Sequence, residues 1–216
     1  MSLHLSADHI TRPGHVEQVR LADGSTVHLG PDSAIAIDYD GARRTVRLLA
    51  GQAMFDVTRD PDRPFRVAAG TVTTTVLGTR FDVRMIGGET SVSVSQGHVQ
   101  VEDEGTSPST QRDLLAGDWI RIGGSRPAET GRIAPQLVGG WKRGEVLAEN
   151  RSIASLIDEI RPWYGGRIIV TDADLANRPV TGIYDLRQPV QALSMIVQPY
   201  GGRVTRITPW LLIVSG

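Results

Sequence analysis

Short runs in which apolar and polar side chains alternate fill the chain from about Thr11 to Ile133, and glycines separate them. Two examples are VEQVRLADGSTVHL and ETSVSVSQGHVQVED. Because successive side chains of a strand point to opposite faces, a period of two is the pattern of strands with one buried face. No stretch of this region has the 3.6-residue period of a helix. The N-terminal part of the chain is therefore predicted to be all-β.

This region also contains a loose repeat. LLAGQ at residues 48–52 recurs as LLAGD at residues 114–118, and an apolar strand pattern follows each copy. A recurring unit of strand, glycine and strand favours a roll or solenoid of stacked hairpins. The same pattern is compatible with a closed sandwich, which stays open as the alternative.

Helical periodicity begins only in the C-terminal part. Ile153, Leu156, Ile157 and Ile160 are spaced at i, i+3, i+4 and i+7, which predicts an amphipathic helix. A second helix is predicted over residues 189–200, where a proline occupies the first turn.

The tetrapeptide Tyr-Gly-Gly-Arg follows both predicted helices, at residues 164–167 and 200–203, and a strand pattern comes after each copy. This spacing predicts a duplicated strand-helix-strand (βαβ) unit in a small α+β domain. The fold class is then mainly β with an added α+β domain. We expect a disordered tail at residues 1–11, an all-β domain at 12–134, a linker at 135–143 and an α+β domain at 144–216.

The alternation breaks inside residues 71–84, TVTTTVLGTRFDVR. Buried-type side chains occupy even positions before Gly78 and odd positions after it. If Gly87–Gly88 forms a two-residue hairpin turn, Gly78 faces Gly97 and both strands change their buried face at the same rung. We therefore expect a bend at Gly78, where the hairpin leaves one packed layer for another.

Composition excludes several classes of function. The formal net charge is -1, which gives no electrostatic reason to bind nucleic acid or an anionic membrane. The chain has no cysteine, so disulfides and thiolate metal sites are excluded. No apolar run approaches the ~20 residues of a membrane span, and the first ten residues lack the regions of a signal peptide.

Motifs for a metal, a cofactor or a small-molecule substrate are also missing from the sequence. The five histidines, at positions 4, 9, 15, 28 and 98, have no second ligand at suitable spacing on a predicted helix. The chain has no P-loop, no dinucleotide-binding glycine motif after a strand and no G-x-S-x-G. We predict neither a metal site nor a cofactor.

An ordered set of motifs resembles the periplasmic region of the FecR family of transmembrane anti-sigma regulators. The set comprises LADGSTVHL, RTVRLLAGQAMFDV, VLGTRFDV, SVSVSQGHVQV and LLAGDW, followed by a tryptophan-containing junction and the helix-YGG-strand repeat. The resemblance runs from about Arg12 to the C-terminus. The C-terminal half also resembles the short signalling (STN) domain at the N-termini of secretins and TonB-dependent receptors.

The resemblance implies a signalling role and a set of partners. Family members cross the bacterial inner membrane once, and a cytoplasmic segment binds an extracytoplasmic-function (ECF) sigma factor. The periplasmic part contacts the N-terminal signalling domain of a TonB-dependent outer-membrane receptor, so that a siderophore-type ligand outside changes transcription inside. The sequence contains neither that segment nor the membrane helix, so we expect a periplasmic fragment that reaches the sigma factor only through the missing segment.

The contact with the receptor is expected at a strand edge of the C-terminal half. An exposed edge can accept a partner strand by backbone hydrogen bonds. The candidate edge runs from Arg203 to Val214, with Arg203 and Arg206 as polar contacts and with Trp210 and Leu212 as apolar anchors. Burial of the two apolar side chains in the core is the open alternative.

Some family members cleave themselves at the Gly-Thr of the matching motif, which is Gly78–Thr79 in this chain. The Thr79 hydroxyl would attack the Gly78 carbonyl carbon in an N-to-O acyl shift, and water would open the resulting ester. On the predicted register Gln96 faces Thr79, and His98 is a weak candidate to accept the hydroxyl proton. No action on an external substrate is predicted.

Two other classes of function were considered. A periplasmic or surface β-domain that binds carbohydrate or cell-wall polymer would need a row of exposed aromatic side chains, and the all-β half has few aromatic residues. An enzyme with a site between the two halves would need a convergent polar cluster, which the sequence does not indicate.

Overall fold

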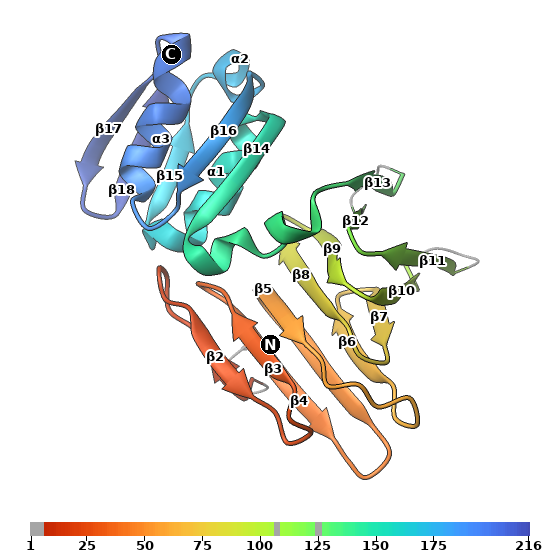
Figure 1. The fold of residues 1–216 in the computed structure, drawn as a ribbon. Helices are drawn as coiled ribbons and strands as arrows, with labels where there is room; N and C mark the ends of the chain where they lie inside the picture. Colours follow the sequence, from red (N-terminus) through yellow and green to blue (C-terminus); the bar gives the residue numbers. More distant parts are fainter. Residues whose placement is uncertain (1–6, 106–108, 124–126) are drawn as a thin grey trace. The chain divides into compact units, whose positions relative to one another are not determined.

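The computed structural model describes residues 7–105, 109–123 and 127–216. The chain forms two compact units (Figure 1). The β unit contains the chain up to Thr11 and Val16–Gly139, and the α+β unit contains Arg12–His15 and Gly140–Gly216.

The described residues of the β unit form thirteen hydrogen-bonded strands arranged in two layers that share one long strand. Layer A has the order β1-β4-β5-β6-β7-β10-β11, and its pairs are antiparallel except β5 with β6. Layer B has the order β2-β3-β5-β8-β9-β12-β13, and all its pairs are antiparallel. The strands of layer A are β1 (His9–Ile10), β4 (Ala34–Tyr39), β5 (Arg44–Asp56), β6 (Phe65–Ala69), β7 (Val72–Val76), β10 (His98–Asp103) and β11 (Thr110–Leu115). Those of layer B, besides β5, are β2 (Glu17–Arg20), β3 (Thr26–Leu29), β8 (Arg80–Ile86), β9 (Glu89–Gln96), β12 (Asp118–Gly123) and β13 (Glu129–Arg132).

Strand β5 passes from one layer to the other near Gly51. Its first part pairs with β4 and β6, and its last part, from Gly51 onwards, pairs with β3 and β8. The second copy of the sequence repeat, residues 114–118, lies where the chain passes from β11 in layer A to β12 in layer B. The LLAG repeat therefore marks two places where the chain changes layer.

Aromatic side chains fill the core between the layers. The rings of Phe55 and Phe81, from layer B, are stacked with centroids 5.2 Å apart, and Phe55 meets the edge of Phe65 from layer A at 6.0 Å. All three side chains are fully buried. A mainly β fold is confirmed, while the roll or solenoid of stacked hairpins, with a closed sandwich as the alternative, stays a prediction.

The register predicted for the glycine-containing hairpin is confirmed on both sides of the bend. Phe81 pairs with Val94 in layer B, and Thr74 pairs with Val101 in layer A. The hairpin strands β8 and β9 lie in layer B, while their continuations β7 and β10 lie in layer A. The change of buried face is therefore a change of layer, as expected.

The prediction of a disordered tail up to residue 11 is wrong for residues 7–11, and residues 1–6 lie outside the described part. His9–Ile10 form β1 and pair with β4. Thr11 is buried, and its hydroxyl donates hydrogen bonds to the carbonyls of Gly30 and Ser33. A strand of two residues is too short to give a period-two signal, which explains why the sequence pattern missed it.

The α+β unit contains two strand-helix-strand segments in succession and a last strand. Its helix α1 begins after Ser152, whose hydroxyl accepts a hydrogen bond from the Ser155 amide, and ends at Gly165 in the left-handed conformation. The elements are β14 (Glu145–Ser152), α1 (Ile153–Tyr164), β15 (Arg167–Val170), α2 (Ala173–Ala176), β16 (Pro179–Asp185), α3 (Pro189–Val197), β17 (Arg203–Thr208) and β18 (Leu211–Ser215). The unit also contains the short 3-10 turns η3 (Gly140–Arg143) and η4 (Gln198–Tyr200), while η2 (Pro135–Leu137) lies at the end of the β unit.

In the α+β unit, the two strands of each segment do not pair with each other. Strand β14 pairs antiparallel with β16, and β18 lies between β15 and β17. In a βαβ unit the two strands are parallel neighbours joined through the helix. Neither segment of this unit forms such a pair. The segment Arg12–His15 also belongs to this unit, where the Gly14 amide donates to the carbonyl of Pro162 at 2.9 Å.

Candidate functional site

The connection from β7 to β8 at Gly78–Thr79 is held from one side by the loop that joins β5 to β6, residues 57–64. The Val57 amide donates to the Thr79 carbonyl at 3.1 Å, and the Asp60 amide donates to the Leu77 carbonyl at 2.8 Å. The carbonyls on both flanks of Gly78 are therefore fixed by one loop. We call this loop, residues 57–64, the clamp loop.

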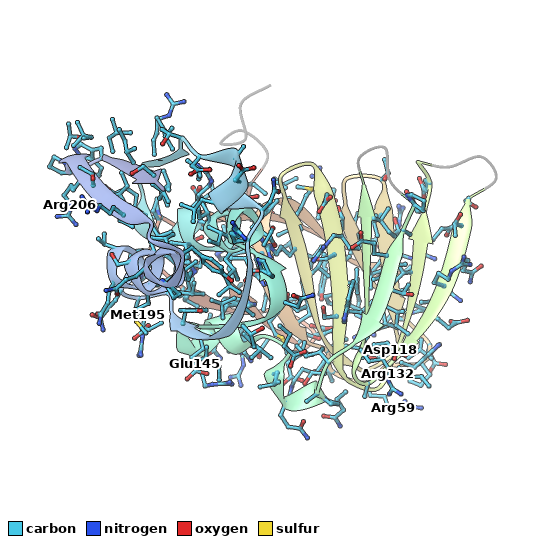
Figure 2. All side chains as sticks on the ribbon, turned by 90° about the horizontal axis from the view of Figure 1, so that it is seen from above. Arg59, Asp118, Arg132, Glu145, Met195 and Arg206 are labelled. Atoms are coloured by element: carbon cyan, nitrogen blue, oxygen red, sulfur yellow. The ribbon has the colours of Figure 1, made fainter. Side chains whose placement is uncertain are left out.

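The clamp loop also lies directly against Gly78. A Cβ atom on Gly78 would lie 2.6 Å from the Cβ atom and 2.7 Å from the Cα atom of Arg59. Figure 2 shows Arg59 at one end of the strands of the β unit. The close approach of two backbones explains why residue 78 is a glycine.

Thr79 is buried, with only 5% of its surface exposed, and its hydroxyl donates a hydrogen bond to the main-chain carbonyl of His98 at 2.9 Å. Gly97 adjoins the same hydroxyl. A Cβ atom on Gly97 would lie 3.0 Å from Thr79 Oγ1 and 3.3 Å from the Gly78 carbonyl oxygen. The Thr79 hydroxyl and the oxygen of the Gly78 carbonyl, whose carbon an acyl shift would attack, thus line the space left by the missing side chain of Gly97.

The imidazole of His98 does not face the Thr79 hydroxyl. It is half exposed, and its Nε2 atom lies 3.0 Å from the Asp113 carboxylate on β11. A main-chain carbonyl can orient a hydroxyl but is too weak a base to take its proton. His98 is therefore in contact with Thr79, but through its backbone and not through the ring that the sequence suggested as proton acceptor.

Gln96 is also placed differently from the predicted register. It pairs with Arg80, because the register shifts by one residue between Arg80 and Phe81. Such a bulge bends the strand at the point where it leaves its layer. The clamp loop, in contrast, was missed altogether, since no sequence pattern connects residues 57–64 to Gly78.

The second candidate site is the β17–β18 hairpin of the α+β unit. Strand β17 pairs with β18 on one side only, so it is an edge of its three-stranded sheet. Arg203 and Arg206 are exposed on it, as are the neighbouring residues from 205 to 208. Figure 2 shows Arg206 on this strand.

Trp210 lies in the turn of the hairpin with 70% of its surface exposed. Its backbone is fixed, because its carbonyl accepts a hydrogen bond from the Arg167 amide and the Tyr164 hydroxyl donates to the Pro209 carbonyl. Ile207, on β17, is also 54% exposed. The hairpin thus presents two large apolar side chains on a rigid backbone.

Leu212 is not available to a partner, and its assignment as an apolar anchor is wrong. It is fully buried and lies on β18, the central strand of the sheet. The candidate edge therefore narrows from residues 203–214 to β17 and the turn that follows it.

The described residues contain no group of three or more His, Cys, Asp or Glu side chains that could hold a metal ion. None of the helices in the described ranges has the length and apolar character needed to cross a membrane. In the β unit, the three phenylalanines are fully buried, and Trp119 packs against Gly131 beneath the Arg121 guanidinium. No row of exposed aromatic side chains forms among the described residues of that unit, which removes support from carbohydrate binding.

Comparison with known proteins connects this architecture to a family. Two crystal structures share the fold, each described as a "putative anti-sigma factor" from Parabacteroides distasonis ATCC 8503. They are both 23% identical to this chain, with TM-scores of 0.85 and 0.84, and the alignments cover 95% and 96% of this chain and 97% of each of the others. No curated protein sequence gives a significant match.

The β unit is thus a two-layer domain with glycine-marked crossings, and its fold is shared with those structures. Residues 7–100, which cover β1 to the first part of β10, match the family model described as FecR protein. This match, over less than half of the chain, agrees with the resemblance that the ordered motifs indicated.

Proposed function

We propose that this chain is the periplasmic signalling module of a FecR-type anti-sigma regulator. It would contact the signalling domain of a TonB-dependent outer-membrane receptor and relay the status of a siderophore-type ligand to an ECF sigma factor. The sigma factor would be bound by a cytoplasmic segment, as in other regulators of this family. The match of residues 7–100 to the FecR model supports this class of function, and the edge position of β17 is the observation that carries the contact with a partner.

Strand addition is the mode of binding that suits this edge. An incoming strand gains main-chain hydrogen bonds from the unpaired side of β17, and its side chains provide specificity. The sequence of β17, RVTRIT, carries two positive charges and no negative one. A partner strand with carboxylate side chains is therefore favoured, and salt should weaken its binding.

Calorimetric titration with the signalling domain of the receptor encoded nearest in the same genome tests this proposal. Trp210→Ala and Arg206→Glu should each weaken binding by about tenfold or more, as expected for an exposed aromatic or arginine at an interface centre. Ile183→Ala, which removes a 64% exposed side chain from β16 in the other sheet, is the matched control and should bind as the wild type does. Equal affinities for all three variants would refute the β17 contact.

We also propose that the chain cleaves itself between Gly78 and Thr79, because a specific geometry favours this second activity. The Thr79 hydroxyl is buried and oriented by the His98 carbonyl, and together with the Gly78 carbonyl oxygen it lines the space beside Gly97. In the step, the Thr79 oxygen bonds to the Gly78 carbonyl carbon, the C–N bond breaks and the hydroxyl proton ends on the released amine. Water then hydrolyses the ester to a Gly78 carboxylate and restores the Thr79 hydroxyl.

Denaturing electrophoresis of the purified chain tests the cleavage. Wild type should yield fragments of residues 1–78 and 79–216, and Thr79→Ala should stay intact. Thr58→Ala, a threonine of the clamp loop that contributes its main-chain carbonyl to the structure, is the control and should still be cleaved. An intact wild-type chain after prolonged incubation would contradict the proposed reaction.

A further inference from the structure

A buried arginine lies behind the clamp loop. Arg44, at the start of β5, has 1% of its surface exposed. Its guanidinium donates to three main-chain carbonyls of the clamp loop: to Arg63 at 2.7 Å, to Thr58 at 3.0 Å and to Asp60 at 3.2 Å. A single side chain therefore fixes the clamp loop at three points along its length.

The charge of Arg44 is balanced within the core. Its Nη1 atom lies 2.8 Å from the buried carboxylate of Asp23, and the guanidinium lies over the Phe65 ring with its carbon 5.7 Å from the centroid. Burying a charge is costly unless it is paired and hydrogen-bonded, and here the guanidinium is paired with Asp23 and makes four hydrogen bonds. Filling the same volume with an apolar side chain would avoid this cost, so the planar fork of donors serves to hold backbone carbonyls.

Hydrogen bonds of the clamp loop connect Arg44 to the Gly78–Thr79 peptide. Asp60 connects the two sides directly, because its carbonyl accepts from Arg44 while its amide donates to the Leu77 carbonyl. Val57 holds the Thr79 carbonyl in the same way, and Arg59 of the loop is packed on Gly78. The peptide bond between Gly78 and Thr79 is thus bracketed by groups whose positions depend on Arg44.

We infer that Arg44 is a positioning residue for self-cleavage. Through the clamp loop, it holds the Gly78–Thr79 peptide so that the Thr79 hydroxyl stays aligned with the Gly78 carbonyl carbon. This inference rests on the proposed cleavage. Misplacement of reacting groups by about 1 Å can slow a reaction about a hundredfold, so loss of the hold should slow the acyl shift without touching the reacting atoms.

The rate of cleavage in folded protein tests this role. Arg44→Met keeps an unbranched apolar stem but removes the guanidinium and its donors, and it should slow cleavage by about tenfold to a hundredfold. Arg44→Lys keeps the charge and should retain an intermediate rate. Adding hydroxylamine, which opens esters, shows whether the acyl shift itself is slowed. Ile120→Ala, in the buried part of β12, lowers stability elsewhere in the β unit and should cleave at the wild-type rate.

Hydrogen exchange of the clamp-loop amides tests the positioning role of Arg44 independently of whether the chain cleaves itself. In Arg44→Met the amides of Val57 and Asp60 should exchange at least tenfold faster than in Ile120→Ala, because their loop is released. If wild type cleaves and Arg44→Met cleaves equally fast, the positioning role is overturned. If wild type does not cleave, the proposed reaction fails. If the amides of Val57 and Asp60 are equally protected in Arg44→Met and in Ile120→Ala, Arg44 does not fix the clamp loop, and the positioning role fails as well.

Discussion

Asp23 and Arg44 form a buried ion pair whose contribution to stability depends on pH. Burial alone would raise the pKa of Asp23, but hydrogen bonds from the Ser25 hydroxyl and amide and from Arg44 outweigh it, so the pKa lies below the ordinary value of 3.8. A carboxyl whose pKa is lower in the folded state stabilises the fold at pH above the unfolded value. That stabilisation is lost as the pH falls through the folded-state pKa.

Asp23→Asn should therefore destabilise the chain by about 3 kcal/mol near neutral pH, because it leaves the Arg44 charge buried without its partner. The difference from wild type should stay constant down to about pH 5 and shrink below the unfolded pKa of Asp23. Urea denaturation at several pH values measures both effects. Asp38→Asn, at an exposed pair with Arg47, is the control and should cost less than about 1 kcal/mol at any pH. If the difference in unfolding free energy between Asp23→Asn and wild type did not change with pH, the lowered pKa of Asp23 in the folded state would be contradicted.

The pairing of strands could be predicted from the sequence where a local pattern determines it. It could not be predicted where contacts between distant segments determine the position of a strand in its sheet. The period of two and the Gly87–Gly88 turn were sufficient to predict the pairing of β8 with β9 from Phe81 to the turn, and the layer change at Gly78, but not the pairing of β8 with β5. The position of β18 between β15 and β17 could not be predicted, because the spacing of apolar residues does not say which strand of a sheet is central. For that reason Leu212 was assigned to an edge while it lies in the core.

The contacts of the clamp loop could not be predicted from a local sequence pattern either. Residues 57–64 have no period, and their contacts to Gly78 and to Arg44 come from strands far apart in the chain. Burial of an arginine is also contrary to the usual distribution of this residue type. The candidate bond could therefore be found from the motif, but the groups that hold it could not.

The corner between β9 and β10 is the element that adjoins the Thr79 hydroxyl, and Gly97 within it has a φ of +90°. Gly97→Ala should cost more than the roughly 1–2 kcal/mol of a left-handed alanine, because its Cβ would also press on Thr79 Oγ1. It should slow cleavage too. Gly88→Ala is the matched control, since Gly88 has a φ of +79° and open space around it. Denaturant unfolding compares the two variants, and equal costs would show that Gly97 is not crowded.

At the scale of the molecule, cleavage at Gly78–Thr79 would divide both layers of the β unit between two fragments. Residues 1–78 contribute β1 to β7, and residues 79–216 contribute β8 onwards. Strand pairing joins the fragments in each layer, through β5 with β8 and through β7 with β10. The stack of Phe55 on Phe81 also spans the two fragments.

We therefore expect the cleaved chain to remain one folded particle. The two fragments should elute together in size-exclusion chromatography under native conditions and separate only in denaturant. Intact Thr79→Ala provides the reference elution volume. Separation of the fragments without denaturant would mean that the shared layers do not hold them together.

The central claim is that β17 receives a partner strand, and hydrogen exchange of the chain with and without the receptor signalling domain tests it most directly. Amides in Arg203–Thr208 that face away from β18 should become protected on binding. Those of Arg167–Val170, in β15 at the opposite edge of the same sheet, should exchange as before. Binding that leaves the amides of β17 unchanged, or the absence of any binding by the folded chain, would contradict the account.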